Sequence, residues 1–211
     1  MCGRYTLTAD PRTLAEHFGV EFPAEARYNV APTQQVSVIR DGLSLLRWGL
    51  VPSWSTEPKA SFSNINARRE TVATSPAFRS AFKSRRCLMP ADGFYEWQPG
   101  PPKVPHHFRL ASGEPFAFAG FWERWDKGAE PLETCALLTT DANPTVAVAH
   151  ARMPVILRPE DYARWLDAST PAAELQSLLV PYPGPMTATA VSPYVNTPGH
   201  QGPRCVEPGG A

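Results

Sequence analysis

Apolar and polar residues alternate in many short runs along this chain, and proline or glycine interrupts most of them. Two alternating runs, at 35–40 and 43–48, flank Asp41-Gly42, a pair typical of tight hairpin turns. The other runs with strand character are 2–7, 86–90, 93–97, 106–110, 116–122, 134–140 and 186–191. The pattern therefore predicts many short strands joined by turns.

Helical patterns are fewer. Asp10-Pro11 supplies a cap and a first-turn proline for a helix to about Phe18. Asn66 is expected to cap a short helix beginning at Ala67. The remaining predicted helices are 75–82, 140–150, 159–166 and 171–179. Because no linker or repeat divides the chain, we expect one domain over 1–197 and a flexible Gly/Pro-rich tail over 198–211.

Composition narrows the class of protein. The chain has 211 residues, 43% of them hydrophobic, which suffices for one core. Its formal net charge is zero, so any anion site must be local. The four cysteines have no CxxC spacing, so we expect neither a metal or other cofactor nor a disulfide framework. With no signal peptide or membrane span in view, the sequence predicts a reduced, cytoplasmic monomer.

Positive charge is concentrated in one part of this neutral chain. Between Lys59 and Arg86, seven basic residues face one acid, Glu70, a local net charge of +6. Such a block can be a solvated helical face, or a surface that binds phosphates through guanidinium groups.

The second residue offers unusual chemistry. If Met1 is removed, Cys2 presents an α-amine and a thiol on adjacent carbons. An aldehyde can then form an imine with the amine and a thiazolidine with the sulfur. The alternative is a cysteine near a chain end with no role.

Two aromatic segments leave alternatives open. Glu96 lies between Tyr95 and Trp97 in an apolar strand, where an unpaired carboxylate would be costly, although alternation also allows it to be exposed. Trp48 and Trp54 can be core residues or a platform on which bases stack.

Taken together, six motifs resemble the SRAP family, the SOS response-associated peptidases, also described as abasic-site processing proteins. They occur in the family's order: Met-Cys-Gly-Arg-Tyr at 1–5, Tyr-Asn-Val-Ala-Pro-Thr at 28–33, Arg-Trp-Gly-Leu-Val-Pro at 47–52, Asn-Ala-Arg-Arg-Glu-Thr at 66–71, Gly-Phe-Tyr-Glu-Trp at 93–97 and His-Ala-Arg-Met-Pro at 150–154.

The resemblance implies an α+β fold, in which a mixed, mostly antiparallel sheet wraps into a barrel-like core with helices outside. It also implies covalent capture of the ring-opened aldehyde of an abasic site, in single-stranded DNA or at a junction with duplex. Cys2 would form the link, Asn66 would position the amine and Glu96 would shuttle protons. His150 would assist ring opening and reversal.

The resemblance further implies a DNA-binding surface, so that the protein would join the nucleoid when it binds DNA. Arg4, Arg68 and Arg152 match arginines that hold phosphates. We also place Asn29, Trp48 and Trp97 on this surface.

Other functions compete with this interpretation. Cys2 can act as the thiolate of an N-terminal-nucleophile peptidase, including an autopeptidase that removes its own Met1. The chain can also be a non-catalytic single-strand-binding module. A lyase reaction at the lesion would share the Cys2 imine.

Overall fold

The computed structural model describes residues 2–58 and 64–209. Four α-helices are present in this part of the chain: α1 Pro11–Phe18, α2 Arg79–Ser84, α3 Tyr162–Leu166 and α4 Ala172–Leu178. The strands are β1 Tyr5–Leu7, β2 Arg27–Val30, β3 Gln35–Ile39, β4 Leu43–Trp48, β5 Asn66–Arg68, β6 Arg86–Ala91, β7 Gly93–Gln98, β8 Val104–Leu110, β9 Phe116–Trp125, β10 Leu132–Asp141, β11 Arg152–Pro154, β12 Ile156–Leu157 and β13 Met186–Ala190.

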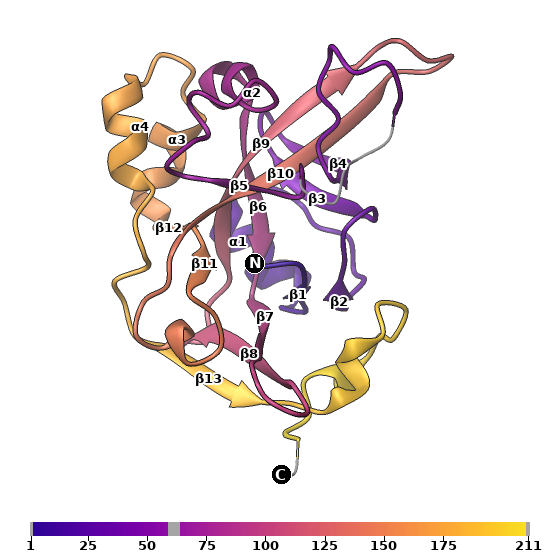
Figure 1. Cartoon of the computed structure of the whole chain (residues 1–211), viewed down its shortest axis with the longest axis vertical. Coiled ribbons are helices and arrows are strands. Elements are labelled where there is room, and N and C mark those ends of the chain that lie inside the picture. Colours follow the sequence, from indigo (N-terminus) through magenta and orange to yellow (C-terminus); the bar gives the residue numbers. More distant parts are fainter. Residues whose placement is uncertain (1, 59–63, 210–211) are drawn as a thin grey trace.

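The strands form two sheets. One has the order β13-β8-β7-β1-β2 and lies at the lower end of the view in Figure 1. The other follows β11-β10-β4-β3-β6-β9-β12, and β10 also pairs with β9. Pairing therefore runs around β10, β4, β3, β6 and β9, but β3 and β6 share only the pair Ile39↔Leu88. The sheet is barrel-like without being a regular closed barrel, which confirms the expected mixed α+β class.

Strand β10 is the most connected element of the larger sheet. It pairs antiparallel with β9 and β11, and parallel with β4 and β5. Most other pairings are antiparallel, as expected from the hairpin-rich sequence. Large buried side chains such as Trp48, Phe118 and Trp165 fill the core, and α2, α3 and α4 gather at one end of the molecule (Figure 1).

Several local predictions are confirmed. Asp10 caps α1 by accepting from the backbone N–H of Arg12, and Pro11 opens the helix. Strands β3 and β4 form the hairpin expected around Asp41-Gly42. No helix in the described ranges 2–58 and 64–209 is both long and apolar enough to cross a membrane.

Two helix predictions are wrong. Asn66 begins strand β5 rather than capping a helix, because residues 66–68 pair in parallel with β10. Segment 140–150 contains only a short 3-10 helix, Val146–Val148, since β10 continues to Asp141 and the Oδ1 of Asn143 accepts from the N–H of Val146 at 3.0 Å. In both places tertiary pairing overrides a local preference.

The expected flexible tail is also corrected for its described part, residues 198–209. This segment contains the 3-10 helix Pro203–Cys205, and the side chain of Cys205 is fully buried. The backbone of Val191 forms a bridge with that of Pro208. Proline and glycine shape an irregular but packed segment here, which appears in yellow beyond β2 in Figure 1.

The basic block is divided by the fold. Arg86 is 4% exposed and donates four hydrogen bonds of 2.5–2.9 Å to carbonyl oxygens. Arg85 pairs with Glu123 at 2.7 Å. These two arginines therefore serve the packing of α2 and α3, while Lys59 lies outside the described residues and phosphate binding by the exposed members of the block stays a prediction.

We predict that Arg86→Met lowers the free energy of unfolding by roughly 3 kcal/mol, because buried carbonyl oxygens lose their donor. Lys83→Met, at an exposed position of the same block, should change it by less than about 0.5 kcal/mol. Urea unfolding of both variants provides the measurement. Equal effects would contradict the structural role of Arg86.

Candidate functional site

Cys2 lies just before β1 and is fully buried. Its Sγ is 3.7 Å from the carbonyl oxygen of Arg4, which also accepts from the backbone N–H of Tyr95 at 3.0 Å. The start of the chain is therefore held against β7. Burial, and after it the charge of Glu96, raises the pKa of the Cys2 thiol well above its ordinary value. The thiol consequently keeps its proton at neutral pH.

Asn66 joins Cys2 to the larger sheet. It is the first residue of β5, and its Nδ2 donates a 2.7 Å hydrogen bond to the carbonyl oxygen of Cys2. Its Oδ1 is buried and has no hydrogen-bond partner among the described residues. A buried amide oxygen beside Cys2 is suited to accept from an amine or a hydroxyl group.

Of the two placements that the sequence allows for Glu96, the structure shows the buried one, with 4% of the residue exposed. It lies on β7, opposite His106 of β8, and its charge acts on the Cys2 thiol. Burial raises the pKa of Glu96 to about 7. The carboxyl group is therefore present in both protonation states near neutral pH, which suits an acid–base group.

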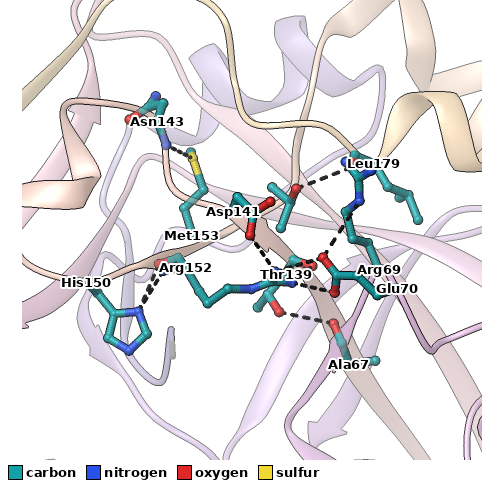
Figure 2. A network of polar contacts seen from close by, with 11 residues as sticks. Ala67, Arg69, Glu70, Thr139, Asp141, Asn143, His150, Arg152, Met153 and Leu179 are labelled. Carbon is teal, nitrogen blue, oxygen red and sulfur yellow. Dashed lines mark hydrogen bonds and ion pairs between the residues drawn. The ribbon is translucent and has the colours of Figure 1, made fainter.

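His150 follows the 3-10 helix Val146–Val148 and is half-buried. Its Nδ1 accepts from the backbone N–H of Arg152 at 2.9 Å, as Figure 2 shows. The same Nδ1 is 3.2 Å from the carbonyl oxygen of Arg152, so the tautomer of the neutral ring depends on which of these two contacts Nδ1 makes. Burial lowers the pKa of His150, so the neutral ring is favoured at pH 7.

The side chain of Arg152 is bound within the protein. Its Nη atoms donate to both carboxylate oxygens of Glu70, to Asp141 and to the carbonyl oxygen of Thr139, at 2.8–3.0 Å (Figure 2). These contacts join the chain after β5 to β10 and to the loop that carries His150. Arg152 therefore positions His150, and a contact with phosphate stays a prediction.

Three other predicted DNA-binding residues are accessible. Arg68 is exposed, and because side chains alternate along a strand it lies on the same side of β5 as Asn66. Arg4 and Trp97 are half-buried, and the Arg4 guanidinium lies over the Trp97 ring, 5.8 Å from its centroid. A cation beside an aromatic face suits the phosphate and the base of a nucleotide.

Two predicted DNA-binding residues are corrected. Trp48 is fully buried and donates through Nε1 to the carbonyl oxygen of Ile65 at 2.9 Å, so it offers no ring face to a base. Asn29 is also fully buried, and its Nδ2 donates to carbonyl oxygens near the C-terminal end of the chain. Within their motifs, the side chains of these two residues face the interior of the fold.

A pocket of about 510 Å³ adjoins the start of the chain. Its lining residues are Gly3, Arg4, Ala31, Pro32, Thr33, Trp97 and Pro198. Thr33 has a φ of 72°, a conformation that is strained for a β-branched residue and is often found at functional sites. Thr33 belongs to the motif at 28–33, but the residue type gives no signal of a positive φ.

The described residues contain no group of three or more His, Cys, Asp or Glu side chains arranged as metal ligands. All four cysteines are free and buried. The functional groups that meet at the start of the chain are the thiol of Cys2, the amide of Asn66 and the carboxyl group of Glu96.

Comparisons with known proteins place the chain among its relatives. The family model described as SOS response associated peptidase (SRAP) matches residues 1–198. The abasic site processing protein YoqW of Bacillus subtilis is 42% identical over 98% of this chain and 99% of its own length. The abasic site processing protein HMCES of Gallus gallus is 34% identical over 77% of this chain, which corresponds to 56% of the chicken protein.

A solved structure shows the same fold. A protein from Bacteroides thetaiotaomicron, determined by X-ray crystallography, aligns with a TM-score of 0.88 at 27% sequence identity. The alignment covers 99% of this chain and all of that one.

We predict that burial of Glu96 makes stability depend on pH. The pKa of Glu96 is about 7 in the fold and about 4.3 in an unfolded chain. Between these values folding binds a proton at Glu96, so the stability that Glu96 contributes is fully present below about pH 4.3 and is lost as pH rises to about 7. The loss should be on the order of 3–4 kcal/mol and absent in Glu96→Gln.

Urea unfolding from pH 4 to 8 measures this difference. Glu16→Gln, at an exposed position of α1, should retain the wild-type slope. If Glu96→Gln also retained it, the carboxyl group would be ionised in the fold at ordinary pH and the acid–base role would lose its basis.

Proposed function

Because the chain belongs to the SOS response associated peptidase (SRAP) family, we propose that it recognises abasic sites in single-stranded DNA and captures them covalently through Cys2. The observation that supports this proposal most directly is that the buried thiol of Cys2, the amide of Asn66 and the buried carboxyl group of Glu96 lie together at the start of the chain. The names of the relatives supply the substrate class.

The proposed reaction begins after removal of Met1, a residue that lies outside the described part of the chain. The neutral α-amine of Cys2 attacks the C1 carbon of the ring-opened sugar, and the carbonyl oxygen takes up a proton. Glu96 protonates the departing hydroxyl group, so water leaves and an imine forms. The thiol then adds to the imine carbon while its proton passes to the nitrogen, which gives a thiazolidine.

The order of these steps follows from the electrostatics. A thiol whose pKa is raised by burial is a poor first nucleophile, because attack requires the thiolate. An α-amine has an ordinary pKa near 8, so a useful fraction is neutral at pH 7. Asn66 is expected to orient the amine and the sugar oxygen. His150 would exchange protons with the sugar during ring opening and reversal.

A peptidase activity through the Cys2 thiolate is a second candidate, which the family name favours. The same buried, protonated thiol argues against it, because burial and, after it, the charge of Glu96 both oppose formation of the Cys2 thiolate. Lyase activity fits the imine better, since an imine permits β-elimination of the 3′ phosphate. We expect a monomer that works on DNA in the cytoplasm.

Substitution of Cys2 tests the covalent step. Cys2→Ala should abolish a heat-stable adduct with an abasic oligonucleotide on a denaturing gel. Cys2→Ser should retain an imine, trapped by borohydride, but form no thiazolidine. Intact mass should show loss of Met1 and, after reaction with wild type, one added oligonucleotide less one water. A heat-stable adduct with Cys2→Ala would overturn the proposal.

Substitution of Arg68 tests the DNA surface. Arg68→Gln should weaken noncovalent binding of any single-stranded sequence and reduce the salt slope by about 0.7, as expected for loss of one phosphate contact. Arg12→Gln, at an exposed position of α1, is the matched control. Fluorescence anisotropy at several salt concentrations measures both. An unchanged slope in Arg68→Gln would place the phosphate path elsewhere.

A further inference from the structure

Asn196 contacts two of the predicted DNA-binding side chains at once. It ends the 3-10 helix Pro193–Asn196 and is exposed. Its Oδ1 accepts from Trp97 Nε1 at 2.7 Å, and its carbonyl oxygen accepts from Arg4 Nη2 at 3.3 Å. The guanidinium of Arg4 and the indole of Trp97 are thus both hydrogen-bonded to Asn196, and the guanidinium lies over the indole ring.

The contacts of Arg4 leave one side of its guanidinium available. Its Nη1 donates to Asn29 Oδ1 and to the carbonyl oxygen of Val195, both at 2.9 Å, which uses both Nη1 hydrogens. Nη2 uses one hydrogen on Asn196. No described residue accepts from Nε or from the second Nη2 hydrogen, and two such donors match two phosphate oxygens.

The segment that carries Asn196 is anchored to β2. Nδ2 of Asn29 donates to the carbonyl oxygens of Val195, Thr197 and His200 at 3.0–3.2 Å. Gln201 closes the contact from the other side, because its Oε1 and Nε2 bind the backbone N–H and carbonyl of Asn29 at 3.2 and 3.0 Å. Asn196 is therefore held by a rigid framework rather than by a loose chain end.

The position of Asn196 matters because its two partners form one wall of the pocket beside Cys2. Arg4 and Trp97 both line that pocket, together with Pro198 from the same C-terminal segment. The half-buried indole of Trp97 also packs against Tyr95, and the hydrogen bond from its Nε1 adds the polar contact that selects one rotamer of the ring. Without that rotamer, the cation resting on the ring would lose its stacking partner.

We infer that Asn196 is a positioning residue for DNA recognition: it fixes Trp97 and Arg4 as a cation–aromatic wall that receives a sugar-phosphate unit of single-stranded DNA. The inference rests on the proposed function for its ligand, but concerns noncovalent binding and not bond formation. Because Asn196 acts through the wall, its loss should weaken affinity and leave the capture rate at saturating DNA unchanged.

The test compares Asn196→Ala with Thr197→Ala, an adjacent exposed position that accepts hydrogen bonds from Asn29 and His200 through its backbone carbonyl oxygen. Binding of an unmodified fluorescein-labelled single-stranded oligonucleotide should weaken about two- to tenfold in Asn196→Ala, as for loss of one hydrogen bond. Thr197→Ala should match wild type. In a Trp97→Phe background the Asn196→Ala effect should shrink, because the donor is already gone.

An independent readout follows the indole itself. The Trp97 Nε1–H resonance, assigned from its disappearance in Trp97→Phe, should shift in Asn196→Ala and stay in place in Thr197→Ala. Single-turnover capture of an abasic oligonucleotide over a range of DNA concentrations should show a raised half-saturation point with an unchanged maximum.

Each outcome decides a claim. An unmoved indole resonance, equal affinities of the two variants, or a lowered maximal rate in Asn196→Ala would overturn the inference. Wild-type protein that binds single strands but never captures an abasic site would remove the proposed function, while the affinity and resonance measurements would still decide the role of Asn196. Wild-type protein without affinity for single strands would overturn both.

Discussion

The amide of Asn66 donates a 2.7 Å hydrogen bond to the carbonyl oxygen of Cys2, and this contact fixes the start of the chain against the middle of the larger sheet. Chain ends fray unless something holds them. Here Asn66, which holds Cys2, is itself fixed in place because β5 pairs with β10. The geometry of the site therefore depends on the packing of β10, which lies far along the sequence.

Burial around Cys2 and Glu96 sets the protonation states of the groups at the site. Removal of water disfavours charge, so the thiol stays protonated and the carboxyl group of Glu96 becomes available near neutral pH. The positive groups lie at the margins, where Arg4 and Arg68 keep contact with solvent. Under the proposed function, attraction of DNA would therefore fall to solvent-exposed side chains and proton transfer to buried ones.

Much of the site could be predicted from short motifs, because Cys2, Asn66 and Glu96 each carry a functional group that is unusual in its setting. The same motifs misplaced Trp48 and Asn29, since a motif does not say whether its residues point outward or into the core. Asn66 was expected to cap a helix because capping is a local preference, whereas its pairing with β10 is a contact across 71 positions, from Asn66 to Leu137. Burial and long-range pairing are properties of the whole fold.

The parallel pairing of β5 with β10 also has a consequence for synthesis. Cys2 is among the first residues to leave the ribosome, but the strand that carries Asn66 has no partner until β10 has emerged, and His150 follows later still. Contacts between such distant segments form late in folding. A nascent chain therefore carries Cys2 without the side chains that surround it in the fold. If Cys2 captures aldehydes as proposed, that selectivity would be acquired only when folding is complete.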